Sequence, residues 1–283
     1  MTSPDGSDRL VSLESTVYVV EEAKVLYVQV FKAACTTMLW TMAGLAGVER
    51  DQLPFSTGAY VSRDMVIHDR RIHPVPTIGE VSDALRHEAL TSDEWMRLGV
   101  TRDPYARLYS GWESRILLLH KGPWSTYPQP PLVDDGRSLD VGASFRSFVA
   151  SMEEHRGVWQ GDFHFAQQVH LLALDEIDYT DLVTTKELSS LFVRLSDRVG
   201  HPVDPGRLNE GLGIAYTDVY DEETARRCEQ LFDQDFDRLS FSHQSFRVPR
   251  PAILVGPAYN ALQMVRGRNQ RLQDLSNYID SLS

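Results

Sequence analysis

Residues 25–30 form a short apolar run, VLYVQV, and this run most constrains what the chain can fold into. A continuous β-branched run of this length is typical of a strand buried on both faces of a parallel sheet. It leads directly into the turn FKAACTT, residues 31–37, and then into apolar residues on one helical face, with Gly44 and Gly47 near the end. A strand, a tight turn and a helix begin a βα unit. The sequence therefore predicts an α/β fold with a central parallel sheet flanked by helices.

A second unit of the same kind is predicted from residue 96 onward. Residues 96–100 predict a strand, and in the TRDP that follows, Asp103 is predicted to be an N-cap and Pro104 the first helical residue. Apolar side chains then recur at three- and four-residue spacing as far as Leu119, which predicts an amphipathic helix. The opposite side of this helix carries Arg107, Ser110 and Ser114.

Shorter patterns predict the remaining elements: strands at 65–67 and 179–183, and helices at 145–149, 163–174 and 221–239. Residues 121–138 are rich in proline and glycine and predict a long loop. This loop is either a lid over a binding site or a plain surface insertion.

The two ends of the chain differ from its middle. Residues 1–15 are polar and are predicted to be a flexible N-terminus, before a folded domain over 16–250. Residues 251–283 predict a C-terminal helix in which apolar residues recur in heptads. One row is Val265, Leu272 and Ile279, and a second row, Leu275 and Leu282, is interrupted by Arg268. The helix either packs on its own domain or forms a homodimer contact.

Composition limits the partners and the compartment. Hydrophobic residues make up 42% and charged residues 24%, as in ordinary globular proteins, and the net charge of −12 argues against nucleic acid as a partner. No apolar run approaches the roughly 18 residues that span a bilayer, and no secretory signal is evident. With only Cys35 and Cys228, we expect no disulfide framework and a cytoplasmic location.

Both predicted strand-to-helix turns place cations where ligands bind in open α/β sheets, at the carboxyl end of a strand. In the first turn, small residues let the backbone approach a phosphate and the helix N-terminus supplies amide donors. Lys32 adds a point charge, and Thr36 and Thr37 add hydroxyl groups. In the second, Arg102 together with Arg107 and Ser110 suits another phosphate. Alternatively, Arg102 pairs with a carboxylate and Ser110 is merely exposed.

Several other chemistries are excluded by what the sequence lacks. There is no G-x-x-x-x-G-K-[ST] motif, and Lys32 precedes the small residues instead of following them, which points away from ATP and GTP hydrolysis. Cys35 has no evident histidine partner and is interpreted as a small turn residue, not a nucleophile. The histidines are scattered, and His68 and His73 lack a carboxylate-rich loop, so no metal site is predicted.

The pair FKAACTT … VTRDPYARLYSGW resembles the two signatures that bind 3'-phosphoadenosine 5'-phosphosulfate (PAPS) in a sulfotransferase family. That family includes the Golgi carbohydrate sulfotransferases and many bacterial relatives. Its members typically read PK-small-small-C-T-[ST] and V-R-[DH]-P-[FY]-x-R-L-x-S. Here Phe31 replaces the proline and Thr101 replaces an apolar residue. Five further segments match family segments in the same order along the chain: 65–73, 163–168, 178–187, 209–210 and 232–241. The resemblance therefore covers about residues 24–242.

The resemblance implies a three-layer fold like that of P-loop NTPases, with the C-terminal helix as an extension. It also implies a PAPS site without a metal, with 3'-phosphoadenosine 5'-phosphate as the product. Arg102 and Ser110 would bind the 3'-phosphate, and Lys32 would stabilise charge on the leaving oxygen. The 5'-phosphosulfate would be held by Lys32, Ala33, Ala34, Cys35, Thr36 and Thr37.

A hydroxyl acceptor needs a general base. His68 is the first choice, because it lies between the two signatures, where some relatives keep their base. His73 and Glu113 are the alternatives.

The family favours a carbohydrate or glycoconjugate acceptor, while a bacterial secondary metabolite or a lipid hydroxyl is almost as compatible. The aromatic side chains of Trp112, Trp124, Tyr127 and Trp159 either stack on the acceptor or belong to the core or lid. Two rival functions remain: an ATP-dependent phosphotransferase, and a catalytically degenerate binding subunit that uses the C-terminal heptads.

Overall fold

The computed structural model describes residues 14–54, 62–120, 127–206, 208, 211–246 and 251–282. The chain divides into two compact units, each built from separate segments. The first unit comprises Met1–Phe55, Asp64–Arg102 and Gln167–Asn209, and the second comprises Ser56–Arg63, Asp103–Ala166 and Glu210–Ser283.

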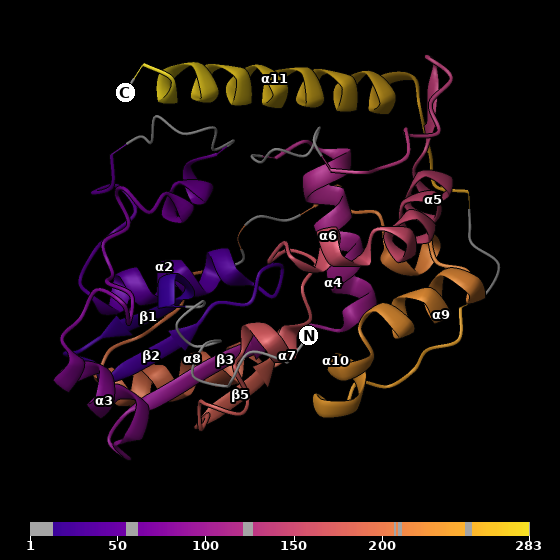
Figure 1. Cartoon of the computed structure of the whole chain (residues 1–283). Helices are drawn as coiled ribbons and strands as arrows, with labels where there is room; N and C mark the ends of the chain where they lie inside the picture. The colour runs from indigo at the N-terminus through magenta and orange to yellow at the C-terminus, as the bar shows by residue number, and fades with distance from the viewer. Residues whose placement is uncertain are drawn as a thin grey trace. The chain divides into compact units, whose positions relative to one another are not determined.

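The described part of the first unit contains a four-stranded sheet with strands in the order β1, β2, β3, β5 (Figure 1). The strands are β1 (Val17–Val20), β2 (Val25–Val28), β3 (Met96–Thr101) and β5 (Asp181–Thr184). β2, β3 and β5 run parallel, with Val28 opposite Gly99 and Gly99 opposite Leu182. The parallel sheet predicted from the βα units is thus confirmed. The antiparallel edge strand β1 is an addition that the sequence analysis did not predict.

Helices cover both faces of this sheet, as the predicted layers require. α2 (Cys35–Leu45) and α8 (Leu188–Val199) share one core with alternate residues of β2 and β3. On the other face a Cβ at Gly99 would lie 2.7–2.9 Å from the side chains of Leu182, Tyr179 and Leu172. Only glycine therefore lets the segment after α7 (Gln168–Leu171) approach β3 this closely. α3 (Asp83–Thr91), capped by Ser82, lies between the two βα units in the chain.

Residues 65–67 are not a strand, contrary to the sequence prediction. They lie in the 3₁₀ helix η2 (Arg63–His68). β2 pairs with β1 and β3, and β3 pairs with β2 and β5, so this segment cannot pair with either of the two central strands. Instead, Val66 and Ile67 are buried in the α2 core, and the Trp40 indole donates a 2.8 Å hydrogen bond to the Asp64 carbonyl.

The second unit is mainly helical around an aromatic core. α4 (Pro104–Trp112) begins as predicted, with Asp103 accepting a hydrogen bond from the Ala106 amide, but it continues as the π-helix η3 (Glu113–Leu117). Trp112 and Trp159 are fully buried, which assigns both to the core. The other helices are α5 (Val141–Glu154), α6 (Arg156–Gln160), α9 (Glu222–Leu231), α10 (Asp233–Arg238) and α11 (Gly256–Asp280).

Two predicted helices are interrupted. The helix predicted over 221–239 breaks at Phe232, whose ψ of 34° ends α9 before α10 starts. Within 163–174 the helix α7 has only four residues, because Asp162 accepts a hydrogen bond from the His164 amide and holds a turn there.

The remaining elements are short. η1 (Glu14–Thr16) and η5 (Tyr216–Asp218) are 3₁₀ turns, and β4 (Ser138–Asp140) pairs antiparallel with β6 (Ile253–Val255). Residues 1–13 of the predicted flexible N-terminus, and 121–126 of the predicted loop with Trp124, lie outside the described residues. Within the described ranges, no helix combines the length and apolar character needed to cross a membrane.

Candidate active site

The turn between β2 and α2 has an unusual backbone. Lys32 and Ala34 both adopt the left-handed conformation, with φ of 68° and 56°. The Ala33 amide donates a 3.2 Å hydrogen bond to the Val30 carbonyl. The Met38 amide donates a 3.0 Å hydrogen bond to the Ala34 carbonyl, where the helix starts. Left-handed residues in such a turn direct successive amides toward one concavity, a geometry that binds anions.

The N-terminus of α2 carries no side-chain cap among the described residues, because its N-cap position is Ala34. Its first turn contains Cys35, Thr36 and Thr37 and no acidic residue. The first amides of a helix have no intrahelical acceptor, and the helix dipole adds partial positive charge there. With the small side chain of Ala33 alongside, the turn can accept a phosphate or sulfate group at its backbone.

The structure brings the two predicted cation-bearing motifs together. β2 and β3 are parallel neighbours, so the residues that follow them emerge at the same edge of the sheet. Arg102 lies directly after β3, and its Nη1 donates a 3.1 Å hydrogen bond to the Lys32 carbonyl. The guanidinium group is thereby held against the turn that bears Lys32.

Gln168 is a residue whose role the sequence analysis missed. Its Oε1 accepts from the Arg102 amide at 2.9 Å, and its Nε2 donates to the Arg102 carbonyl at 2.8 Å. The side chain is completely buried. The available signal was its place at the end of the FHFAQQ segment, which matched the family pattern without indicating a function.

His68 also reaches the turn. Its Nε2 lies 2.9 Å from the Thr36 hydroxyl oxygen, and the Met65 sulfur lies 3.9 Å from the same oxygen. The 3₁₀ helix η2, not the predicted strand, delivers this imidazole to the first turn of α2. His68 therefore stands beside the predicted anion site, as a general base would have to.

The two alternative bases are engaged elsewhere. His73 Nδ1 lies 3.1 Å from both the Val75 amide and carbonyl, and its Nε2 is buried without a partner among the described residues. Burial lowers the pKa of His73 from 6.5 to about 4, which makes it a poor base near neutral pH. Glu113 is buried in the second unit, where its carboxylate accepts from the Leu212 amide at 3.0 Å.

Arg107, predicted to lie on the polar side of its helix with Ser110, is buried. It is only 1% exposed, and its guanidinium donates to the carbonyls of Ala166 at 2.7 Å and Phe163 at 3.1 Å. These backbone acceptors explain why a charged residue lies inside the second unit. Ser110 is half-buried on α4 of the same unit. Cys35 is a buried free thiol, consistent with a small turn residue.

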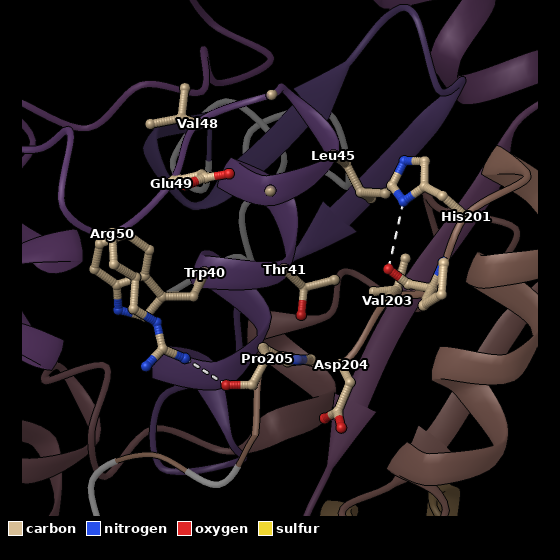
Figure 2. A pocket seen from close by; sticks show the side chains of 13 residues that line it. Trp40, Thr41, Leu45, Val48, Glu49, Arg50, His201, Val203, Asp204 and Pro205 are labelled. Atoms are coloured by element: carbon tan, nitrogen blue, oxygen red, sulfur yellow. Dashed lines mark hydrogen bonds between the residues drawn. The ribbon is translucent and has the colours of Figure 1, made fainter.

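A pocket of about 540 Å³ lies elsewhere in the first unit, along the second half of α2 and residues 201–205 (Figure 2). Arg50 forms one wall, where it contacts the Pro205 carbonyl and lies 5.5 Å from the Trp40 ring centroid. Its lining includes none of the predicted site residues. In the described ranges no cluster of His, Cys, Asp or Glu could hold a metal ion.

A model of the sulfotransferase family matches residues 15–242. The chain belongs to this family. The match spans both turns, η2 and Gln168, so this sulfotransferase has sulfuryl transfer as its reaction class. It ends before β6 and α11. No curated protein and no solved structure matches the chain significantly.

Proposed function

We propose that this sulfotransferase transfers the sulfuryl group of PAPS to a hydroxyl group of a carbohydrate or glycoconjugate. The observation that carries the proposal is the contact between its two phosphate motifs, the hydrogen bond from Arg102 to the Lys32 carbonyl. An anion-binding turn with a second guanidinium beside it suits a nucleotide that carries two separate phosphate-type groups.

In this proposal the turn holds the 5'-phosphosulfate through the amides at the start of α2, and Lys32 supplies the neutralising charge. Arg102, with Ser110, binds the 3'-phosphate. A planar guanidinium binds a phosphate in a bidentate manner and stays charged at all working pH values. ATP lacks a 3'-phosphate, so this contact would make the site bind PAPS in preference to ATP.

His68 is the proposed general base. It takes the proton from the acceptor hydroxyl as that oxygen bonds to sulfur. The bond between sulfur and the 5'-phosphate oxygen breaks, and its electron pair stays on the phosphate, where Lys32 stabilises it. The contact with Thr36 holds the imidazole beside the turn. Positioning and charge stabilisation supply most of the catalysis in such displacements.

The acceptor class rests on the family alone, and a small secondary metabolite or a lipid hydroxyl is the alternative. Trp112 and Trp159 are core residues, so they do not support the idea of a sugar-stacking platform. Tyr127 packs on Trp159 with ring centroids 5.1 Å apart. A catalytically degenerate binding subunit is the alternative function, although Lys32, Arg102 and His68 argue against it.

Calorimetric titration with 3'-phosphoadenosine 5'-phosphate tests the donor. We expect micromolar binding by the wild type, with 5'-AMP much weaker. Arg102→Ala should lower the affinity by about 10- to 100-fold, the loss expected for a charge-assisted hydrogen bond. Arg194→Ala removes an exposed arginine of the same unit, paired with Asp181, and should bind normally. Absence of binding by folded wild type would contradict the donor assignment and favour the degenerate subunit.

A further inference from the structure

α11 has one face anchored to its own unit. Leu262, Asn269 and Ser276, spaced by seven residues, are buried. Arg266 donates to the Ile116 carbonyl at 2.9 Å and also to that of Leu117, and Asn269 donates to the Leu118 carbonyl at 2.6 Å. These bonds satisfy carbonyls at the end of η3 that a helix leaves without intrahelical donors. This face of α11 therefore packs against its own unit.

The opposite side of α11 carries a second stripe, which we call the seam. Six exposed residues follow spacings of four and three, as in a coiled coil. Five lie on the helix, and Leu282 follows two residues after its end: Met264, Arg268, Arg271, Leu275, Tyr278 and Leu282. Four of them are large and apolar, with exposures of 76%, 58%, 62% and 70% for Met264, Leu275, Tyr278 and Leu282. At 100° per residue, the seam points nearly away from the anchored face.

The charges on the seam select an orientation for a second copy. A parallel, in-register pair would place Arg268 against Arg268 and Arg271 against Arg271, which is repulsive. An antiparallel pair centred near Gln273 places Arg268 on the partner's Tyr278, a cation–π arrangement. It also sets Arg271 against the partner's Leu275, at the level of the partner's Asp274.

The apolar residues fit the same antiparallel register. Met264 comes opposite the partner's Leu282. Beside the seam, Val265 comes near the partner's Ile279, and Leu272 lies close to the partner's Leu272 at the twofold axis. Each of these pairs occurs twice about the axis, as a self-complementary twofold interface requires.

We propose that two copies of this chain pair through the seam of α11 as antiparallel helices. The helix lies outside the residues matched by the family, so the proposal stands apart from the donor assignment. A second copy is the partner that the charge pattern favours, because it offers a Tyr278 ring to each Arg268 and an Asp274 carboxylate at the level of each Arg271.

Sedimentation equilibrium of the full chain tests the pairing. We expect wild type to be a dimer at micromolar concentration and Leu275→Lys to weaken dimerisation at least about 100-fold, because it sets a second positive charge against the partner's Arg271 within the seam. Asn277→Lys, exposed on the same helix but off the seam, should remain dimeric. Unchanged circular dichroism of both variants shows that folding is intact. A monomeric wild type, or a dimeric Leu275→Lys, would overturn the proposal.

Cysteine cross-linking tests the orientation. Leu272→Cys should give a covalent dimer with a short bismaleimide, since the two residues meet at the axis. Met264→Cys should give none, because its copies lie roughly 27 Å apart along antiparallel helices. Cross-linking of both variants would indicate parallel pairing, and cross-linking of neither would exclude the register. Wild type, whose Cys35 and Cys228 are buried, measures the background.

Discussion

Gln168 holds both the amide and the carbonyl of Arg102, at 2.9 and 2.8 Å, from a completely buried position. Arg102 in turn contacts the Lys32 carbonyl. A single amide side chain thus fixes the residue that joins the two phosphate motifs. We regard Gln168 as a positioning residue for the proposed 3'-phosphate contact.

Replacing Gln168 should therefore reduce discrimination between nucleotides. Gln168→Ala leaves the Arg102 amide and carbonyl without these partners, so we expect affinity for 3'-phosphoadenosine 5'-phosphate to fall about tenfold, with 5'-AMP nearly unchanged. Calorimetry with both ligands measures the ratio. Thr180→Val is the matched control, because the Thr180 hydroxyl makes the same pair of contacts to Arg97 at the other end of β3. In an Arg102→Ala background the Gln168 effect should disappear; an additive loss would contradict a positioning role.

Removal of His68 should affect the chemical step. We expect His68→Ala to lower kcat by about 10²- to 10⁴-fold, the usual contribution of a general base, with little change in KM for PAPS. Steady-state kinetics over a range of pH provides the measurement. His73→Ala, which removes a histidine engaged with Val75, should keep kcat within a few fold. A His68→Ala enzyme with normal kcat would assign the base to another residue.

His73 should make the fold acid-sensitive. Its pKa is lowered from 6.5 to about 4, chiefly by burial. As pH falls below 6.5, the unfolded chain binds a proton that the folded chain refuses until about pH 4. The free energy of unfolding should therefore decrease through this window, by about 1–3 kcal/mol from this group. Urea unfolding of wild type and His73→Asn between pH 7 and 4 measures it. The difference between the two proteins should change with pH only there; parallel curves would contradict the shift.

The Glu113 carboxylate occupies the space where a side chain at Gly211 would lie, since a Cβ there would overlap the carboxylate oxygen. Gly211→Ala should destabilise the protein by about 1–3 kcal/mol, the usual cost of overpacking. In a Glu113→Ala background the same substitution should cost much less, while in Glu113→Gln, which keeps the volume, the cost should persist. Thermal unfolding of the six proteins, each background with and without Gly211→Ala, gives the coupling. Equal costs in all backgrounds would show that the two residues do not compete for space.

The sequence carries the local signals but not the long-range ones. β2, β3 and the start of α4 were predictable because the apolar runs, Asp103 and Pro104 act within a few residues. Residues 65–67 are too short a run to distinguish a strand from a 3₁₀ turn. The burial of Arg107 depends on carbonyls more than fifty residues away along the chain. The hydrogen bonds between Gln168 and Arg102 join residues that are equally distant in sequence. Helical periodicity places a polar residue on a face without showing what covers that face.

The left-handed backbone at Lys32 and Ala34 has a consequence for how much enzyme a cell maintains. Each residue that carries a Cβ costs about 1–2 kcal/mol in that conformation, so the turn lowers the stability of the folded chain. A ligand at 100 times its Kd stabilises the folded chain by about 2.7 kcal/mol. If PAPS is that ligand, its binding offsets a cost of this size, and the amount of folded enzyme in the cell would follow the cellular concentration of PAPS.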